Sequence, residues 1–441
     1  MRIFLIYPGL VEGFDSYRKG HDWFNHGVGI ISSILKREGH SVEYLDCRRM
    51  KGWSEVDKTI DVTPFDLAMI SVATVDFDPA KRIARKIKQK DRSLKVMVGG
   101  PHPTLMTEET ATVADFDYIF THESEVTLPS VLKNLSDTPR VIKGAMPKVL
   151  DELLFVDRSL APEGETPWFH DLAKPYFAIT ASRGCLYQCT FCQPAERAVF
   201  GNTVRKRSVD NILDELTALA DHYGMRSFMI HDDCFTQYYP WVEEFCKKKQ
   251  RRGLTQPFAC QSRADIICRR PDLMQRLYDA GLRWVLIGFE SGSDRVLAFL
   301  KKNTTVSQNL EAAHICKRIG IKIFANYMFG LPTETKEEMS ATVKMIRAIK
   351  PEHCSPSVFT PAPGSELYEY CRDSGLILIT SSEGYRRSSD STGKIKGVDY
   401  RYVQSMICRS LGPVRGMYLR LLLLKGRMTR GSRRPVQGHS D

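Results

Sequence analysis

The stretch Ser182-Arg183-Gly184-Cys185-Leu186-Tyr187-Gln188-Cys189-Thr190-Phe191-Cys192, here called the cysteine loop, places three thiols close together. The spacing Cys-x3-Cys-x2-Cys allows Cys185, Cys189 and Cys192 to ligate one small metal centre. A [4Fe–4S] cluster normally takes four Cys, one per iron, so three leave one iron open to another ligand. An open position distinguishes a reactive metal site from a structural one. The alternatives are a zinc knuckle without its fourth ligand and chance clustering among the 12 cysteines.

The cysteine loop resembles the cluster motif of the radical SAM superfamily. The resemblance implies that the open iron chelates the amino and carboxylate groups of S-adenosylmethionine (SAM). It also implies that Phe191, just before the third Cys, lies against the adenine. In that family, reduction of the cluster cleaves SAM to methionine and a 5′-deoxyadenosyl radical. The protein then has to bind, orient and shield its cofactors.

The composition is that of a globular protein of two or three domains. The chain has 441 residues, of which 42% are hydrophobic and 26% charged, and no run approaches the roughly 20 apolar residues of a membrane span. The N-terminus is too short for a signal peptide and is typical of a first strand. A labile iron–sulfur cluster suits a reducing cytosol, so we expect a cytoplasmic enzyme.

Residues 1–140 alternate short apolar runs with helical patterns, which predicts a doubly wound, flavodoxin-like (Rossmann-like) α/β sheet. Such a sheet binds its ligand beyond the carboxyl ends of its strands. The expected strands are residues 2–8, 41–46, 67–75, 95–99 and 117–121.

The loops after these strands resemble those of the cobalamin-binding domain found upstream of many radical SAM domains. The motifs Gly-Gly-Pro-His-Pro-Thr and His-Glu-Ser-Glu carry the likeness. The Asp-x-His-x-x-Gly motif that supplies a histidine to cobalt in the methionine-synthase type is absent, so His26 and His102 lack that context. The alternative is a flavodoxin-like domain that supports the fold or binds substrate. The resemblance implies cobalamin contacts from Pro8, Gly99, Gly100, His102 and Glu123.

The β/α alternation resumes after a linker of residues 141–172, which we expect to cross the mouth of the second domain. Six units predict a partial (β/α)6 TIM-type barrel at residues 173–375, with its chemistry at the C-terminal strand ends. A basic extension, residues 376–441, follows. The expected barrel strands are residues 176–182, 227–232, 258–264, 284–290, 322–329 and 354–360.

The strand ends of the barrel supply further candidates for cofactor contacts. The resemblance puts Glu290 and Ser291 near the ribose or amino-acid end of SAM, and Gly330 in a turn that brings main-chain groups to the adenine edge. Arg263 suits the SAM carboxylate, since guanidinium matches carboxylate geometry, or else a structural salt bridge.

The sequence leaves the roles of two other sets of residues open. His231-Asp232-Asp233 either replaces a glycine-rich turn that meets the SAM ammonium, faces the substrate, or caps a helix. The remaining cysteines have no second close-spaced set, and buried Cys usually behaves as a small hydrophobe.

The net charge of +11 is concentrated in the tail, where residues 401–441 hold nine Arg or Lys against one acid. A basic nucleic-acid-binding surface is therefore not indicated. The tail also contains Leu419 and residues 421–424, all Leu. A basic, leucine-rich segment can lie on an anionic membrane surface. The other interpretation is a C-terminal helix packed on the barrel.

Together these features predict a cobalamin-dependent radical SAM methylase that acts on an unactivated carbon of a small-molecule or lipid-like substrate. Flavodoxin or ferredoxin is the expected electron donor. A radical cyclase resembling the anaerobic magnesium-protoporphyrin ester cyclase is the alternative. A methylthiolating RNA enzyme needs an N-terminal cysteine set, and Cys47 is the only Cys before Cys185. A cobalamin- or metal-responsive binding module would not need the SAM-like strand ends.

Overall fold

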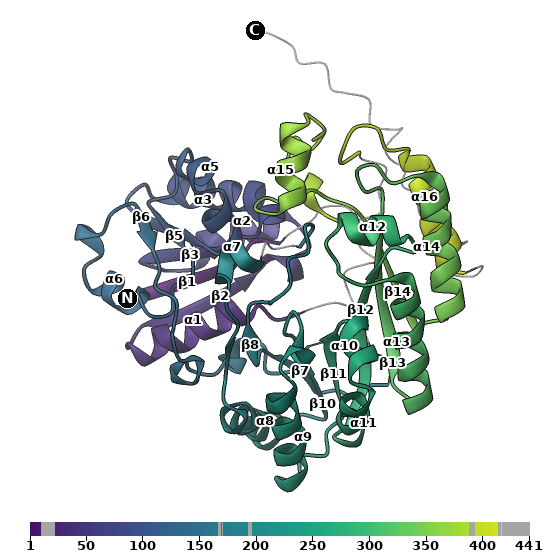
Figure 1. Ribbon diagram of the computed structural model, residues 1–441. Helices are drawn as coiled ribbons and strands as arrows, with labels where there is room; N and C mark the ends of the chain where they lie inside the picture. The colour runs from purple at the N-terminus through teal and green to yellow at the C-terminus, as the bar shows by residue number, and fades with distance from the viewer. Residues whose placement is uncertain are drawn as a thin grey trace.

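Two parallel β-sheets lie side by side in the computed structural model, one from the N-terminal third of the chain and one from the remainder (Figure 1). The structure describes residues 1–9, 23–165, 169, 171–192, 196–387, 393–412 and 416. Both predicted folds are confirmed: a doubly wound sheet precedes a curled half-barrel.

The first sheet contains six parallel strands in the order β2-β1-β3-β4-β5-β6. The strand order changes direction between β1 and β3, and sheets of this kind bind their ligands at that point, beyond the carboxyl ends of the strands. Its strands are β1 (Arg2–Tyr7), β2 (Ser41–Asp46), β3 (Leu67–Ser71), β4 (Lys95–Gly99), β5 (Tyr118–Thr121) and β6 (Val141–Lys143). Its helices are α1 (His26–Arg37), α2 (Trp53–Val62), α3 (Phe77–Lys90), α4 (Pro101–Leu105), α5 (Thr107–Ala111) and α6 (Leu128–Lys133).

Helices cover both faces of this sheet, because alternate residues of each strand point to opposite sides. In β1, Ile3 and Leu5 belong to the core beneath α1 and α6, whereas Phe4 and Ile6 belong to the core beneath α2 and α3. All four are almost fully buried. A strand buried on both faces is therefore an unbroken apolar run.

The second sheet also contains six parallel strands, in the order β14-β13-β12-β11-β10-β7. Its strands are β7 (Tyr176–Ile179), β10 (Ser227–Ile230), β11 (Phe258–Ser262), β12 (Leu282–Glu290), β13 (Lys322–Phe329) and β14 (His353–Val358). The helices between and after them are α8 (Val209–Tyr223), α9 (Tyr239–Arg251), α10 (Ala264–Arg269), α11 (Pro271–Asp279), α12 (Asp294–Phe299), α13 (Val306–Ile319), α14 (Lys336–Ile349) and α15 (Glu366–Asp373).

The helix boundaries of the barrel follow local signals in the sequence. A capping box opens α14: the Thr335 hydroxyl accepts from the Glu338 amide, and the Glu338 carboxylate accepts from the Thr335 amide. α11 begins at Pro271, and proline is favoured at the first position of a helix. α13 ends at Gly320, whose left-handed backbone (φ 94°) suits glycine.

The last part of the linker packs at the amino end of the half-barrel. Phe169 lies in an apolar cluster with Tyr176, Trp284 and Phe324, which stand near the amino ends of β7, β12 and β13. Its ring centroid is 5.0 Å from that of Trp284. At Phe169 the linker therefore fills the amino end of the half-barrel, and the expectation that it crosses the mouth stays a prediction.

Several strand boundaries also differ from expectation. The predicted strand 67–75 ends at Ser71, and a 3-10 turn at Thr74–Asp76 follows. The predicted strand 176–182 is interrupted after Ile179, and β8 (Ser182–Arg183) turns away to pair antiparallel with β9 (Arg205–Lys206). β6 was not expected and extends the first sheet beyond residue 140, into the segment assigned to the linker.

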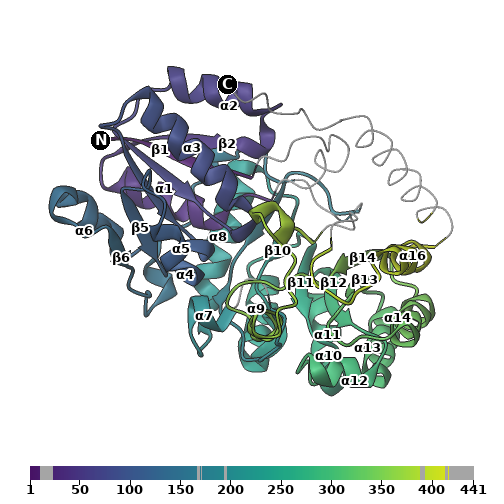
Figure 2. The same cartoon turned by 90° about the horizontal axis from the view of Figure 1, so that it is seen from above.

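The C-terminal extension contacts both domains. α16 (Tyr400–Ser410) packs on α14, with its Val403 and Ile407 buried in the barrel core, as the packed-helix interpretation predicts. A 3-10 turn, Ser382–Tyr385, reaches the first domain, where Ser382 N donates to Asp78 Oδ2 at 2.7 Å. Figure 2 shows this segment between the two lobes. The tail leucines 419 and 421–424 lie outside the described residues.

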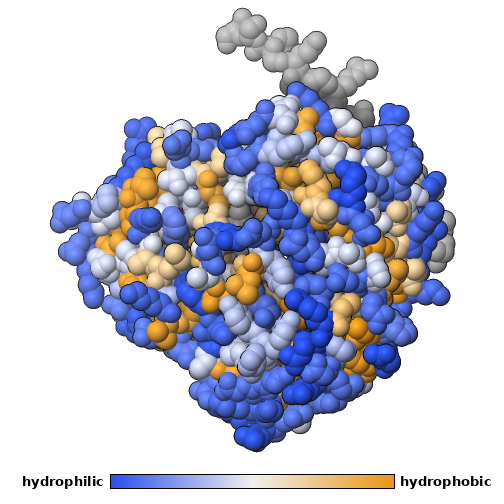
Figure 3. All heavy atoms as spheres, viewed as in Figure 1, coloured by the Kyte–Doolittle hydropathy of each residue, from blue (hydrophilic) through white to orange (hydrophobic). Residues whose placement is uncertain are grey.

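The described part of the chain contains no helix that is both long and apolar enough to cross a membrane. The face shown in Figure 3 is mainly hydrophilic, with apolar side chains in small separate groups.

Candidate active site

The cysteine loop begins at a pair of short antiparallel strands beside the barrel. β8 and β9 pair Ser182 with Lys206 and Arg183 with Arg205, and we call these two strands the cysteine hairpin. Gly184 follows β8 with φ 94°, and a Cβ there would stand 2.8 Å from the Thr203 carbonyl oxygen. Only glycine fits both constraints. The sequence thus directs the chain sharply out of the hairpin and into the loop.

The far end of the cysteine loop is held by the barrel. Thr190 N donates to the Leu300 carbonyl at 3.0 Å, and Leu367 N donates to the Thr190 carbonyl at 2.9 Å. Near the start of the loop, Leu186 N donates to Gln237 Oε1 at 3.2 Å. The backbone of the loop is therefore fixed at both ends.

The thiols of Cys185, Cys189 and Cys192 are partly exposed. Among the described residues, no three His, Cys, Asp or Glu side chains converge closely enough to hold a metal ion. The chemistry of Cys185, Cys189 and Cys192 nevertheless fits a [4Fe–4S] cluster, because three accessible thiols lie in one loop whose ends are held in place. Their assignment as cluster ligands remains a prediction.

Arg263 organises the cysteine loop from the end of β11. Its guanidinium lies 3.5 Å from the centroid of the Tyr187 ring, and Nη1 donates to Cys189 Sγ at 3.6 Å. The same side chain pairs with Asp265 at 2.9 Å and donates to the Lys302 carbonyl. The structural salt bridge considered for Arg263 is thus present, and its contact with the SAM carboxylate stays a prediction.

Glu290 ends β12 in an unusual conformation. Its φ is 61°, and the pairing of β12 with β13 shifts between Gly288 and Glu290. This bulge turns the carboxylate toward Lys302, whose Nζ lies 3.0 Å from Oε1; both residues are buried. A Cβ on Gly288 would stand 2.2 Å from Glu290 Oε1, so a larger residue there would displace the Glu290 carboxylate from its present position.

Lys302 connects Glu290 with the predicted adenine platform. Its Nζ lies 5.8 Å from the centre of the Phe191 ring, which packs against an apolar cluster formed mainly by α12, α15 and the end of β13. Burial opposes the charge of Lys302, but attraction to Glu290 and Cys189 outweighs this effect and raises its pKa. Sequence reasoning missed Lys302, because its partner Glu290 lies across a bulge that no local pattern predicts.

Ser291 and Gly330 make contacts within the protein. The Ser291 hydroxyl is fully buried, 3.3 Å from Thr342 Oγ1 of α14. The amides of Gly330 and Leu331 both donate to Glu334 Oε2, at 2.8 and 3.2 Å. Burial raises the pKa of Glu334 to about 7. Contacts of Ser291 and Gly330 with SAM remain predictions.

Asp232 at the end of β10 acts on the base of the cysteine loop. Its buried carboxylate accepts from the Ala181 amide at 2.7 Å and from the Ser182 hydroxyl at 2.6 Å. Burial raises its pKa to about 7. The neighbouring His231 ring stacks on Trp23 at 4.8 Å. Asp232 thus faces the loop backbone and does not cap a helix.

The predicted cobalamin residues lie on the loops at the carboxyl edge of the first sheet. Pro8 is buried after β1, and Gly99 and Gly100 connect β4 to α4. Gly100 has φ 110°, and a Cβ there would lie 3.0 Å from the Val72 carbonyl oxygen. Two neighbouring loops therefore touch at this edge. Contacts of these residues with cobalamin remain predictions.

His102 is enclosed by the first domain. Its ring lies 4.1 Å from the Phe77 ring, and Nδ1 is 3.4 Å from Thr74 Oγ1. Burial lowers the pKa of His102 to about 4. Its side chain packs inside the domain, and its role toward cobalamin stays a prediction.

The buried His102 makes a prediction for stability against pH. In the unfolded chain a histidine titrates near 6.5, whereas the folded chain keeps His102 neutral down to about pH 4. Below pH 6.5 the unfolded state binds the extra proton, so the free energy of unfolding falls as pH drops. The contribution from His102 between pH 7 and pH 5 is about 2 kcal/mol. Urea unfolding of His102→Gln should lose this part of the pH dependence. If the pH dependence of the unfolding free energy is the same in His102→Gln as in wild type, this prediction is wrong.

Glu123 has a partner that sequence reasoning missed. Its carboxylate pairs with Arg183 and Arg205 of the cysteine hairpin, and Glu125 also pairs with Arg183. The loop that we expected to contact cobalamin is thus joined by ion pairs to the first residues of the cysteine loop. The Arg183-Gly184-Cys185 sequence carries no sign of this pairing.

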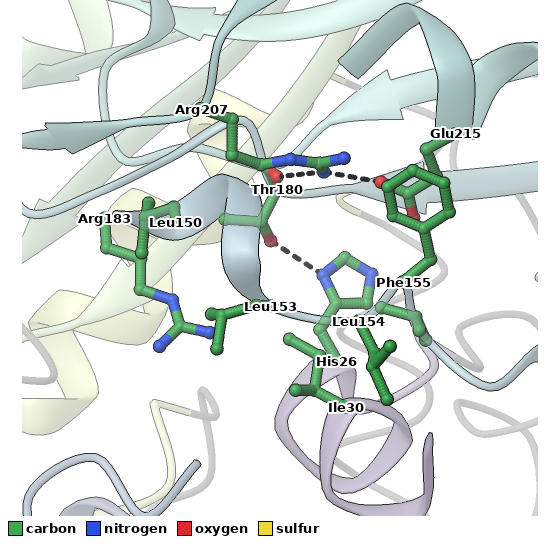
Figure 4. A pocket seen from close by; sticks show the side chains of 11 residues that line it. His26, Ile30, Leu150, Leu153, Leu154, Phe155, Thr180, Arg183, Arg207 and Glu215 are labelled. Carbon is green, nitrogen blue, oxygen red and sulfur yellow. Dashed lines mark hydrogen bonds and ion pairs between the residues drawn. The ribbon is translucent and has the colours of Figure 1, made fainter. Parts of the chain in front are cut away.

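A pocket opens where α1, the linker and the cysteine hairpin meet (Figure 4). Its empty volume, including the open mouth, is about 420 Å³. His26 Nδ1 lies 2.8 Å from Thr180 Oγ1, and burial lowers the pKa of His26 well below its usual range. The pocket therefore presents a neutral imidazole. Its apolar wall consists of Ile30, Leu150, Leu153, Leu154, Phe155 and Val156.

Comparison with known proteins accounts for both halves of the chain. Residues 179–346 match the model of the radical SAM superfamily, and residues 18–132 match that of the B12 binding domain. An uncharacterized methyltransferase of Pyrococcus horikoshii is 26% identical, and the match covers 81% of each chain. The anaerobic magnesium-protoporphyrin IX monomethyl ester cyclase of Cereibacter sphaeroides is also 26% identical, with 85% of this chain and 64% of that protein covered.

A solved structure has the same fold. The cobalamin-dependent S-adenosylmethionine radical enzyme OxsB, with aqua-cobalamin and S-adenosylmethionine bound, superposes with a TM-score of 0.68 at 17% identity. The match covers 92% of this chain and 66% of that one. At this identity the likeness establishes the architecture of the two domains.

Proposed function

Because this chain belongs to the radical SAM superfamily and carries an N-terminal B12-binding domain, we propose that it transfers a methyl group to an unactivated carbon. Its cofactors are a [4Fe–4S] cluster, SAM and cobalamin. The methyltransferase from Pyrococcus horikoshii, which resembles it over both domains, supports methyl transfer as the reaction.

One observation carries this proposal: the carboxyl edge of the first sheet meets the cysteine hairpin through Glu123 and Arg183. Transfer of a methyl group between two cofactors requires that both open onto one space, with the reacting atoms held close together. The contact at Glu123 supports that arrangement, because the loops expected at cobalamin adjoin the loop expected at the cluster.

When bound, the cluster and one SAM would supply a 5′-deoxyadenosyl radical, and cobalamin would supply a methyl group taken from a second SAM, which leaves S-adenosylhomocysteine. The residues of the chain hold and shield these groups. In the proposed site Arg263 holds Cys189 through a hydrogen bond to its sulfur, and the Glu290–Lys302 pair lies beside the Phe191 ring. The ring of His231, stacked on Trp23, forms part of the wall of the proposed site.

A radical cyclase is the second candidate. It is favoured by the Cereibacter sphaeroides ester cyclase, which is as similar in sequence as the methyltransferase and has a match across both domains. Such an enzyme oxidises its substrate and closes a ring without net methylation.

The partners proposed for the chain follow from this chemistry. The substrate is a small molecule, and a lipid-like one if the tail beyond residue 412 contacts an anionic membrane surface. A flavodoxin or ferredoxin supplies the electrons that reduce the cluster. We propose that the protein works in the reducing cytoplasm.

The proposal is tested by mass spectrometry of SAM products from anaerobically reconstituted, cobalamin-loaded protein under reductant. We expect 5′-deoxyadenosine together with S-adenosylhomocysteine, the second product only when cobalamin is present. Deoxyadenosine alone at every cobalamin level would contradict methyl transfer and favour the cyclase. If neither product forms, the iron and cobalt content separates a substrate-gated enzyme from a binding module.

A further inference from the structure

The loop after β5 forms a four-residue network of charges with the cysteine hairpin. Glu123 Oε1 contacts Arg183 Nη1, Glu123 Oε2 lies 2.6 Å from Arg205 Nη1, and Glu125 Oε1 lies 2.8 Å from Arg183 Nη1. Glu123 therefore joins both strands of the hairpin, whereas Glu125 touches only one. Arg183 is separated from Cys185 only by Gly184, so a movement of its backbone is passed directly to the first of the three cysteines.

The network is buried. The side chains of Glu123 and Glu125 are 4% and 8% exposed, and those of Arg183 and Arg205 are 13% and 14% exposed. Removal of one partner from a buried ion pair leaves an uncompensated charge, which is far more costly than the loss of a surface pair. Among the described residues, Arg205 has Glu123 as its one carboxylate partner, whereas Arg183 has two.

The loop that carries the two carboxylates is itself rigid. His122 has φ 63°, a left-handed conformation rare outside glycine, and its amide donates to Thr104 Oγ1 at 2.8 Å. A Cβ on Gly144 would lie 2.0 Å from the Glu123 carbonyl oxygen, so the β6 end packs directly on this backbone. A strained, closely packed loop has little freedom to follow the hairpin, so it holds the hairpin in place.

We propose that Glu123 is a positioning residue through which the B12-binding domain sets the geometry of the cysteine loop. Glu123 acts on the metal site through Arg183 and Arg205, as outer partners orient the ligands of a metal. Glu125 reinforces the same contact from one side. This inference rests on the cluster assigned within the proposed function, and it makes the radical SAM half of the chain dependent on the cobalamin half even before any methyl transfer.

The test compares Glu123→Gln with wild type as full-length, anaerobically reconstituted protein. Two quantities are measured: the dissociation constant of SAM, and the electron paramagnetic resonance spectrum of the reduced cluster with and without SAM. We expect the dissociation constant to rise about tenfold, since loss of an outer partner at a metal site costs 10–100-fold. The spectral change on SAM addition should become broader or smaller. Glu125→Gln should give a smaller change in the same direction, because Glu123 still joins both strands.

Glu165→Gln is the matched control. Glu165 is equally buried and pairs with Arg158 at 3.4 Å, and both residues belong to the linker and not to the cysteine hairpin. Its replacement should lower thermal stability without changing SAM binding or the spectrum. Unchanged values in Glu123→Gln, or an equal change in Glu165→Gln, would overturn the inference. If Glu123→Gln does not fold, unchanged values in Glu125→Gln count against it.

Neither measurement needs a methylated product, so the test separates this inference from the proposed reaction. A wild-type chain that binds SAM on its cluster but makes no S-adenosylhomocysteine refutes methyl transfer and leaves the comparison of variants intact. A wild-type chain that binds no cluster refutes both.

Discussion

Replacement of Cys189 by alanine will leave the reconstituted protein with less than about one iron atom per chain, against about four for wild type. Cys189 is the central thiol of the cysteine loop and receives the Arg263 contact, so the remaining two thiols are too few to retain a cluster. Formation of 5′-deoxyadenosine should fall by more than about a hundredfold, since changes to outer partners of a metal already cost 10–100-fold. Iron analysis and mass spectrometry of the nucleoside products measure both effects.

Cys260→Ala is the matched control for this experiment. Cys260 is fully buried in the barrel core, and burial raises the pKa of its thiol well above the usual range. Its replacement should leave the iron content unchanged. Iron loss from Cys260→Ala would point to a second cluster. Full iron and activity in Cys189→Ala would refute the cluster assignment.

Replacement of Lys249 by methionine will lower the free energy of unfolding by about 3 kcal/mol or more, because it leaves buried carbonyl groups without donors. Lys249 is 0% exposed, although lysine is almost never fully buried. Its Nζ donates to the carbonyls of Leu254, Gln256 and Ala280 at 2.6, 3.0 and 2.9 Å. One ammonium thus ties the end of α9 and the following loop to the end of α11. Urea unfolding followed by circular dichroism measures the change.

Lys248→Met provides the comparison, since it makes the same substitution one residue earlier on the solvent side of α9. Lys248 pairs with Asp210 and Glu244 at the surface, and such pairs contribute little. Its variant should unfold at the wild-type urea concentration. Equal unfolding midpoints for the two variants would show that the three carbonyls find other donors when Lys249 is absent.

The elements with strong local signals could be predicted from the sequence. The bounds of β2, β4 and β13 agree with the predicted ranges 41–46, 95–99 and 322–329. An apolar run that ends in glycine or a polar turn marks such a strand, whatever it pairs with. β6 was missed because three residues with one buried side chain form no detectable period.

Interrupted strands were harder to predict. Residues 176–182 form one continuous candidate in the sequence, yet the chain leaves the sheet after Ile179, where the Asp232 carboxylate accepts from the Ala181 amide and the Ser182 hydroxyl. That carboxylate lies 50 residues further along the chain. A pattern read over a short window contains no trace of such a partner.

The same distinction holds for the candidate site. The cysteine spacing alone indicated the metal chemistry, since it depends on three residues within one loop. The carboxylate of Glu123 was predicted to contact cobalamin, because a polar loop at a strand end is typical of a ligand site, and that contact stays a prediction. The structure shows that this carboxylate pairs with an arginine 60 residues away.

By itself the sequence determined the order of the domains, the parallel α/β character of both, and the loop that carries the three cysteines. These depend on residue spacing and on the alternation of apolar side chains, which are local properties. The tertiary structure alone decided that Glu123 joins Arg183 to Arg205, that Glu290 turns to Lys302, and that Lys249 is buried among carbonyls. Buried charges must find partners of opposite sign or matching hydrogen bonds, and those partners become neighbours only when the chain has folded.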